Sequence, residues 1–231
     1  MATNATGEAE SGPLRLEFDR SVKVEFQGSA ISSDGGLLLH RELDDALGLT
    51  DMAAGLLSDM RTGRNGRHRL PGFLRQSVFS RLAGFEGVND ADRLCRDPVM
   101  RQLVGGHAVN DGAASASAMG RFETEMLTQP ENLAALIELP GRWIDAVHDK
   151  RLPKVITLDM DSSESPVHGD QVGSAWNGHF QKKCLHPLFV FNQFGDLERC
   201  ALRPGNVYSA DGWEDVLKPV LARYSTFARS C

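Results

Sequence analysis

The chain has 231 residues, 41% of them hydrophobic and 24% charged, which is an ordinary globular composition with room for one or two domains. Its formal net charge of -6 excludes a protein that binds nucleic acid through overall positive charge, so any such surface must be a local patch. Four cysteines without a C-x-x-C spacing predict neither a zinc site nor a disulfide framework. Because no run approaches the roughly 18 apolar residues of a membrane span, we expect a cytoplasmic protein with no membrane partner.

The N-terminal part of the sequence changes character after its first few residues. Residues 1–13 are small, polar and acidic, which predicts a disordered tail. Apolar and polar residues then alternate over Leu14–Phe18 and again over Val22–Phe26. This period of two predicts two short strands joined by a turn at Asp19-Arg20-Ser21.

From Leu37 to Asp149, apolar residues recur at helical spacing. The predicted helices are bounded by capping residues, glycines and prolines, and they cover about 37–47, 52–60, 70–83, 89–95, 99–104, 115–127 and 130–148. Ser32 to Gly36 and Thr50-Asp51 supply the capping chemistry for the first two. We therefore expect residues 14–150 to form a mostly helical region, and a small bundle of this kind is compatible with DNA binding without predicting it.

A basic segment, RTGRNGRHR, interrupts the helical region. It contains Arg61, Arg64, Arg67 and Arg69 with one histidine, two glycines and no acidic residue. Guanidinium groups match phosphate oxygens, and phosphate contacts need no readout of bases. Two interpretations stay open, a solvated loop or a loop that contacts DNA phosphates, and we take the four arginines as candidate DNA-binding residues.

The stretch KVITLDMDSSESPVHG begins a region with different chemistry. Its apolar start predicts a strand over Lys154–Asp161, and Asp159 and Asp161 must point to the same side because side chains alternate along a strand. A carboxylate at the end of an apolar strand is costly to bury unless it is paired or binds a metal. The aspartates either cap a loop or provide a divalent-metal ligand, and the sequence that follows favours the metal.

Two further strands and a helix follow the acidic strand. Cys184–Asn192 is strongly apolar, Leu197–Leu202 is its predicted hairpin partner, and Ser209-Ala210-Asp211 begins a helix to about residue 224. Three strands and a helix, with an aspartate on the first strand, open a ribonuclease H-like domain. We therefore predict an α+β protein in which residues 151–231 form an incomplete ribonuclease H-like α/β domain.

The runs LDMDSSESPVHGDQ, NGHFQKKCLHPLFVF and RPGN resemble the DDE transposases of bacterial insertion sequences. The runs LLLHREL, RTGRNGRHRL and SAMGRFE are similar to the N-terminal region of that family, so the resemblance covers most of the chain after the tail. The resemblance implies a DNA transposase that cuts and joins element ends by divalent-metal phosphoryl transfer. It also implies DNA, the terminal repeats of the element, as partner and a homo-oligomer in the synaptic complex.

The family's catalytic aspartate lies on the first strand and is followed within two residues by Ser or Thr. Asp161 matches this pattern and is the implied catalytic residue and metal ligand, with Asp159 as second choice. The carboxylates of the intact family hold two Mg²⁺ (or Mn²⁺) ions that activate the nucleophile and stabilise the leaving oxygen. The family's second Asp and its Glu come after the helix, and Asp211 and Glu214 do not match them. We therefore expect a chain truncated after the first catalytic Asp, with an incomplete active site and no activity alone.

Two alternatives and one fold expectation complete the sequence-based hypotheses. The chain is alternatively a non-enzymatic DNA-binding remnant, or a divergent metal-dependent hydrolase whose aspartates bind metal with His168, His179 and His186. In a ribonuclease H-like sheet the strand at Lys154–Asp161 is central and apolar on both faces. Without its neighbours it would have an unpaired edge, and the C-terminal half would be poorly stable.

Overall fold

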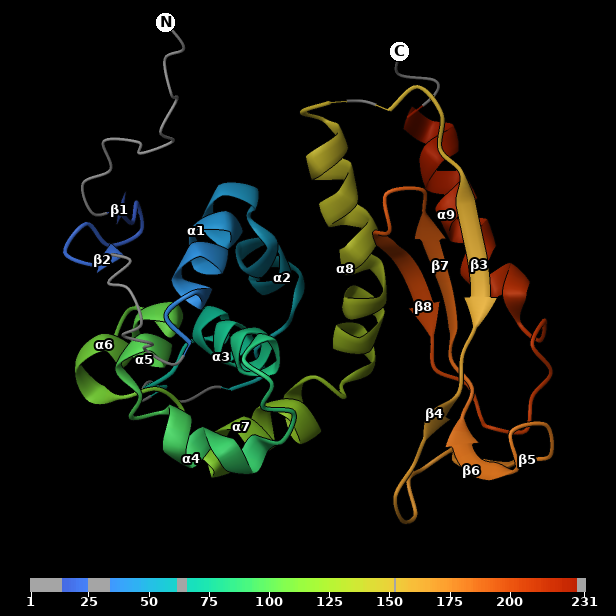
Figure 1. The fold of residues 1–231 in the computed structure, drawn as a ribbon, viewed down its shortest axis with the longest axis horizontal. Helices are drawn as coiled ribbons and strands as arrows, with labels where there is room; N and C mark the ends of the chain where they lie inside the picture. Colours follow the sequence, from blue (N-terminus) through green and yellow to red (C-terminus); the bar gives the residue numbers. More distant parts are fainter. Residues whose placement is uncertain (1–13, 25–33, 62–65, 152, 228–231) are drawn as a thin grey trace, which may run out of the picture. The chain divides into compact units, whose positions relative to one another are not determined.

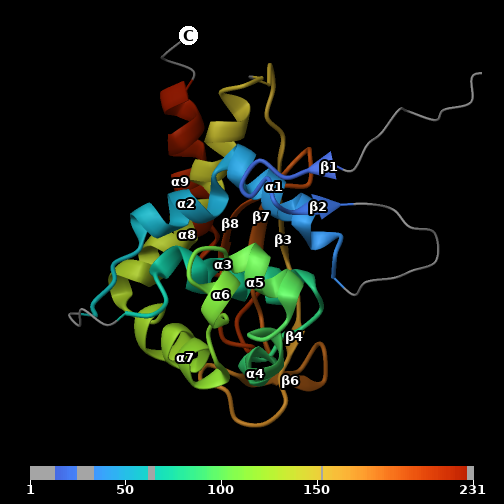
Figure 2. The same cartoon turned by 90° about the vertical axis from the view of Figure 1, so that its left-hand side faces the viewer.

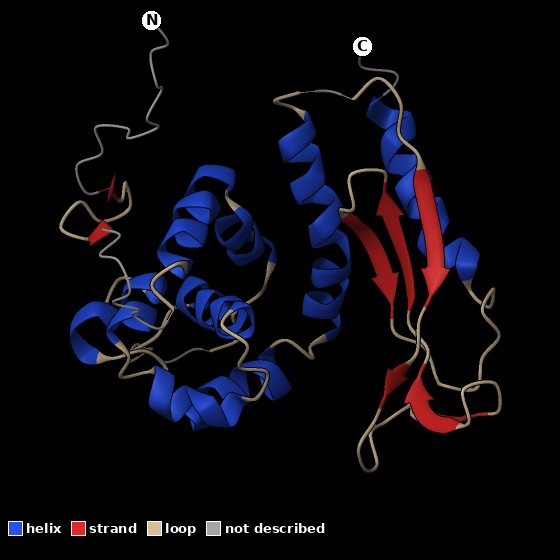
Figure 3. Ribbon diagram, viewed as in Figure 1, coloured by secondary structure: helices blue, strands red, loops and turns tan. Residues whose placement is uncertain are grey.

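The computed structural model describes residues 14–24, 34–61, 66–151 and 153–227. The chain forms two compact units, one reaching to Asn132 and one starting at Leu133 (Figure 1). Helices and small antiparallel sheets make up both, so the predicted α+β class is confirmed (Figure 3). The predicted tail at 1–13 lies outside the described residues, as do Arg64 and the proposed capping residues Ser32 and Ser33. No helix in the described part is long and apolar enough to cross a membrane.

The first unit is mostly helical, as expected. Its described helices are α1 (Leu37–Leu47), α2 (Leu49–Leu56), α3 (Leu70–Leu82), α4 (Ala91–Leu94), α5 (Pro98–Val104), α6 (Ala108–Asp111) and α7 (Ala116–Arg121), with a 3₁₀ turn over Val88–Asp90 and a π-helical turn over Phe122–Met126. The predicted hairpin is present as β1 (Leu14–Arg15) and β2 (Lys23–Val24), which lie beside α1 (Figure 2). Leu16 joins Leu37 and Leu38 in the buried core and so fixes the hairpin to the helices.

Capping chemistry explains which helix ends were predicted correctly. Gly48 has a φ of 76°, a conformation that favours glycine, and its N–H donates to the carbonyl of Asp44, so α1 ends where the sequence predicts. Asp97 accepts a hydrogen bond from the N–H of Met100 at 2.8 Å and begins α5. The predicted start of the next helix at residue 52 is wrong, because Thr50 lies inside α2 and bonds to the side chain of Asp44.

The second unit is built from α8 (Pro130–His148, its residues from Leu133 on), six short strands and α9. One sheet has the order β3-β7-β8 and contains β3 (Leu158–Ser162), β7 (Leu188–Asn192) and β8 (Leu197–Ala201), all antiparallel. The other has the order β4-β6-β5 and contains β4 (Ser165–Pro166), β5 (Ala175–Asn177) and β6 (Lys182–Leu185). On α9 (Trp213–Phe227), Val216 packs against Leu188 and Val190 of the first sheet. The predicted domain boundary near residue 150 stays a prediction, but α8 before it belongs mainly to this unit.

The single strand predicted over Cys184–Asn192 is wrong in one respect. The structure divides it into β6 and β7 at His186 and Pro187, because proline has no N–H to donate to a neighbouring strand. The smaller sheet was not predicted at all. The pairing register is nevertheless continuous, since Asp161 lies opposite Phe189 and Ser165 opposite Leu185. Strands β3 and β4 therefore run beside β7 and β6 as one antiparallel ribbon with a short interruption.

Candidate functional site

The two candidate aspartates lie on one face of β3. Asp159 and Asp161 are exposed, whereas Leu158 and Met160 are partly buried and pack against the cluster around Val190. The alternation predicted from sequence is therefore present, and both carboxylates face solvent from the same side of the sheet.

The strand has the unpaired edge that the sequence predicts, since among the described strands β3 pairs only with β7 and lies at the edge of its sheet. The predicted start at Lys154 and the expectation of a strand that is apolar on both faces are wrong, because β3 starts at Leu158 and its two aspartates are exposed. Val155, expected inside, is 70% exposed. The aspartates are solvated and need no partner to offset burial, so only the side of the sheet that they share indicates a metal site.

The surroundings of the aspartates leave them open to a cation. Asp161 accepts a hydrogen bond at 2.8 Å from the backbone N–H of Ser162, which restrains its carboxylate. Across the ribbon it lies opposite Phe189, and Asp159 lies opposite Phe191. Within the described ranges, no lysine or arginine forms an ion pair with either aspartate. The face therefore carries negative charge without a protein counter-ion.

This donor set fits a single hydrated ion better than a two-ion centre. Mg²⁺ keeps several of its waters and is commonly bound through one or two carboxylates. In the part of the chain that the structure describes, no group of three or more His, Cys, Asp or Glu side chains could hold a metal. Asp161 with Asp159 is thus chemically suited to one partly hydrated Mg²⁺ or Mn²⁺.

The three histidines of the hydrolase hypothesis are not gathered with the aspartates. His186 is buried, and its Nδ1 lies 3.1 Å from the carbonyl oxygen of Val207. His179 packs edge-on against Phe180, and His168 is exposed. The described residues therefore do not assemble the ligand set on which that hypothesis depends.

A buried ionic cluster supports the sheet from its other side. Glu198 of β8 has a wholly buried side chain that accepts hydrogen bonds from Asn192, from the hydroxyl of Tyr224 at 2.6 Å and from Arg223. Desolvation, followed by the hydrogen bond to Glu198, raises the pKa of Tyr224 well above its ordinary value. These bonds fix α9 against β7 and β8, and β7 in turn positions β3.

Helix α8 is part of the same cluster. Asp145 lies 3.5 Å from the Nε of Arg223, and desolvation raises the pKa of its carboxyl although the arginine charge acts in the opposite direction. A side chain at Gly141 would collide with the guanidinium group of Arg223. The absence of a side chain at this helix position is therefore what lets the arginine reach Glu198.

The basic segment divides into one structural arginine and others that stay accessible. Arg61 pairs with both carboxylate oxygens of Asp59, at 2.8 and 2.6 Å, and donates to the carbonyl of His68 at 3.0 Å. Its guanidinium also lies over the ring of Phe73. Arg61 is therefore occupied in holding the segment, whereas Arg67 and Arg69 are exposed.

Arg67 and Arg69 line a cavity of about 540 Å³ together with His68 and His107. Burial lowers the pKa of His68, and the charges of Arg67 and Arg61 lower it further, which is the sign of a locally positive potential. Arg67 also donates a hydrogen bond to a backbone carbonyl, that of Asp111. The cavity thus combines concave shape with positive charge in a chain whose net charge is negative.

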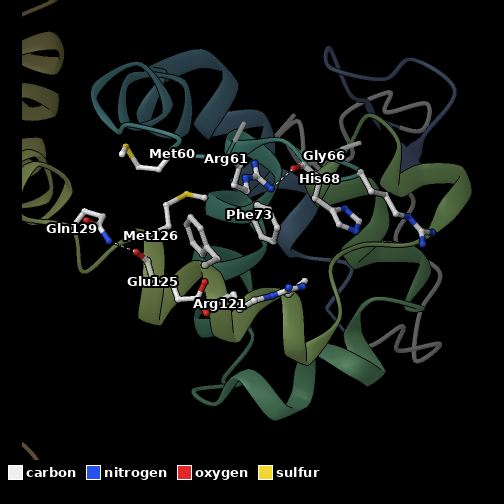
Figure 4. Close-up of a pocket in the computed structure, with 12 residues that line it drawn as sticks. Met60, Arg61, Gly66, His68, Phe73, Arg121, Glu125, Met126 and Gln129 are labelled. Carbon is white, nitrogen blue, oxygen red and sulfur yellow. Dashed lines mark hydrogen bonds between the residues drawn. The ribbon is translucent and has the colours of Figure 1, made fainter. Parts of the chain in front are cut away.

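A second cavity of about 690 Å³ shares Arg67 and His68 with the first. Its apolar floor includes Phe73, Phe122 and Met126, and Arg61 and Arg121 stand at its rim with Glu125 (Figure 4). The rings of Phe73 and Phe122 stack 5.1 Å apart and both are buried. Because these rings belong to the core and the rim carries both charges, this cavity is a weaker candidate for a phosphate site than the first.

Comparison with known proteins decides the family. A family model described as transposase DDE domain group 1 matches residues 14–230. The chain belongs to this transposase family. Neither the curated proteins nor the solved structures give a match. The resemblance to DDE transposases is therefore confirmed over residues 14–230.

Sequence reasoning missed the residues that support the sheet carrying Asp159 and Asp161. It did not single out Glu198, because one charge in LERCA carries no signal of burial. Arg223 gave no signal either, since it lies on a helix with many polar residues. His107 comes near the basic segment only through the fold, although the preceding Gly105-Gly106 did indicate a turn.

Proposed function

We propose that this chain is a DNA transposase of an insertion sequence whose acidic strand β3 faces the DNA backbone. One observation supports this most: in a chain of the transposase DDE family, Asp159 and Asp161 share one exposed face of β3, and no lysine or arginine among the described residues pairs with them. Asp161 is the proposed catalytic residue and Asp159 its neighbour in the same site. The cut and joined DNA would be the terminal repeats of the element.

The second unit supports a ribonuclease H-like assignment for this domain. Strand β3 pairs antiparallel with β7, β7 pairs antiparallel with β8, and α9 then packs on these strands. This is the order in which such a domain begins.

The carboxylate of Asp161, with that of Asp159, would hold Mg²⁺ or Mn²⁺. A bound ion would supply Lewis-acid stabilisation and a more acidic water. The chain's own contribution is positional, since the Ser162 N–H restrains the Asp161 carboxylate and the Glu198 cluster restrains the sheet. Because two carboxylates are few for two ions, we infer that this chain alone holds metal weakly and cleaves DNA poorly.

DNA phosphates would be contacted by Arg67 and Arg69 at the basic cavity. Both are exposed, whereas Arg61 is held by Asp59 and stabilises the segment. Arginine contacts with phosphate release counterions, so this binding should weaken steeply with salt. Assembly of two element ends would further involve a homo-oligomer of this chain.

The experiment is metal-dependent nicking of DNA carrying the element's end sequences, measured beside DNA binding. We expect salt-sensitive binding with little or no nicking by the chain alone. Strong nicking that Asp161→Ala abolishes would confirm the enzyme and refute the inactivity. Weak nicking that Asp161→Ala abolishes supports the transposase, whereas binding with no nicking at all under Mg²⁺ or Mn²⁺ supports the second candidate, a DNA-binding remnant. A chain that neither binds nor nicks DNA would refute both.

A further inference from the structure

The smaller sheet of the second unit presents an exposed tryptophan. Trp176 on β5 is 64% exposed, although tryptophan is one of the more buried residue types on average. It lies directly opposite Lys183 on β6, so the indole and the lysine side chain are neighbours on one face of the sheet. An aromatic ring with an adjacent cation is the combination that binds a nucleobase and its phosphate.

The register places this pair on the same face as the aspartates. Asp161 lies opposite Phe189 and Ser165 opposite Leu185, and the same register continues as Val167 donates to the carbonyl of Lys183 at 3.3 Å. On the opposite face, the alternate residues from Cys184 to Asn192 are buried, namely Cys184, His186, Leu188, Val190 and Asn192. Side-chain alternation therefore puts Lys183 and Trp176 on the aspartate side of the ribbon.

The spacing along the ribbon suits a DNA strand. Six residues separate Asp161 from the position opposite Lys183, which at about 3.3 Å per residue is about 20 Å. That is on the order of six base steps of DNA. A strand lying on this face with its scissile phosphate at Asp161 would reach Trp176 a few nucleotides away.

Lys183 is free to exchange its present partner. Its ammonium pairs with Asp170, whose side chain is 99% exposed, and exposed pairs of this kind contribute little. A phosphate could replace that carboxylate at small cost. Val172, fully exposed two residues after Asp170, adds apolar surface in the loop that precedes β5.

We propose that Trp176 and Lys183 form a binding site for an unpaired nucleotide of the DNA strand that lies at the acidic face. Trp176 stacks on the base and Lys183 contacts the adjacent phosphate. This inference rests on the proposed function, since it assumes that DNA is the substrate, and it adds to it a preference for unpaired over paired nucleotides near the cut.

The test compares binding of the 231-residue chain to a single-stranded oligonucleotide of about 12 nucleotides and to the duplex of the same sequence. Trp176→Ala should weaken single-strand binding about 5- to 100-fold, because stacking is lost, and leave duplex binding unchanged. Trp176→Phe should retain most of the affinity for the single strand, because phenylalanine can still stack on a base. Phe194→Ala is the matched control, since Phe194 is 61% exposed in the β7–β8 turn at the other end of the ribbon.

Lys183→Gln should lower the salt dependence of single-strand binding by about 0.7 in the log–log slope. Lys218→Gln, which removes another exposed lysine paired with a carboxylate, should leave the salt dependence of single-strand binding unchanged. Equal single-strand affinity of wild type, Trp176→Ala and Trp176→Phe overturns the inference while DNA binding itself stands. If Trp176→Ala changes the oligomeric state of the chain and not its affinity for DNA, the surface is a protein contact, and this result also overturns the inference. If the wild-type chain binds no DNA, the proposed function itself is refuted, and the inference that rests on it is refuted with it.

Discussion

Arg223 of α9 donates a hydrogen bond to Glu198 of β8, whose side chain is completely buried. A carboxylate in this environment is stable only because Arg223, Tyr224 and Asn192 satisfy it. The pair joins the helix to the sheet that carries the aspartates. The integrity of the acidic face therefore depends on a charge pair on the opposite side of the sheet.

Removing the carboxylate should be strongly destabilising. Glu198→Ala removes the nearest carboxylate of the mostly buried Arg223, which keeps only Asp145 at 3.5 Å from its Nε, and we expect a loss of about 3 kcal/mol in the free energy of unfolding of the second unit. Hydrogen exchange of β7, β8 and α9 measures this without assuming that the whole chain unfolds in one step. Glu214→Ala, which removes an exposed carboxylate paired with Lys218, should change it by less than about 0.5 kcal/mol. Equal effects of the two variants would contradict the role given to Glu198.

Gly141, which lies against the guanidinium group of Arg223, gives a second prediction. Gly141→Ala places a methyl group where the guanidinium lies, and we expect a loss of about 1–3 kcal/mol from displacing it. Gly120→Ala in α7 meets nothing within 4 Å and should be neutral or stabilising by up to about 1 kcal/mol. Thermal unfolding of both variants in parallel checks this. A stabilising Gly141→Ala would show that Arg223 moves aside freely.

The raised pKa of Tyr224 predicts a change in stability at alkaline pH. Burial and the hydrogen bond to Glu198 hold the phenol protonated in the folded state, while in the unfolded chain it ionises near its ordinary pKa of about 10. The unfolded state therefore loses the proton first, and the free energy of unfolding falls as pH rises above about 10. Denaturant unfolding at pH 8 and pH 11 should show a smaller fall for Tyr224→Phe than for wild type. Tyr208→Phe, at a tyrosine 82% exposed, controls for loss of a hydroxyl and should follow wild type.

The arginines of the basic segment should separate into two classes. Arg67→Ala or Arg69→Ala should weaken duplex binding and reduce the salt slope by about 0.9 each, because each removes one phosphate contact. Arg61→Ala should instead lower the stability of the first unit, since it breaks the bonds to Asp59 and His68. Arg20→Ala, an exposed arginine paired with Glu17 in the hairpin, serves as control for charge alone. An unchanged salt slope for both Arg67→Ala and Arg69→Ala would exclude these residues as phosphate contacts.

Local signals in the sequence predicted the helices best. Gly48 and Asp97 act on their own neighbours, so the ends they set could be predicted without knowing the fold. Thr50 misled because its side chain bonds to Asp44, six residues away, instead of beginning a helix. Period-two alternation likewise predicted the shared side of the aspartates but not that α9 would cover the other side.

Tertiary contacts decided what the sequence could not. The start of β3 at Leu158 follows from pairing with β7, which lies about thirty residues later and begins its register with Leu158 opposite Asn192. The β4-β6-β5 sheet was not predicted because its strands are short. In addition, Pro187 divides one apolar run of the sequence between β6 and β7, which belong to different sheets. Burial of Glu198 depends on an arginine 25 residues away, and no local pattern encodes such a pair.

Metal binding at β3 is the central claim and can be measured directly. Titration of the 231-residue chain with Mn²⁺, following the free ion by electron paramagnetic resonance, should show one weak site that Mg²⁺ competes for. We predict that Asp161→Asn weakens this site at least about tenfold, which is the loss of about 1.4 kcal/mol expected from removing a ligand charge. Asp170→Asn, at an exposed carboxylate paired with Lys183, should leave it unchanged. Wild-type affinity in Asp161→Asn, or equal losses in both variants, would contradict the account.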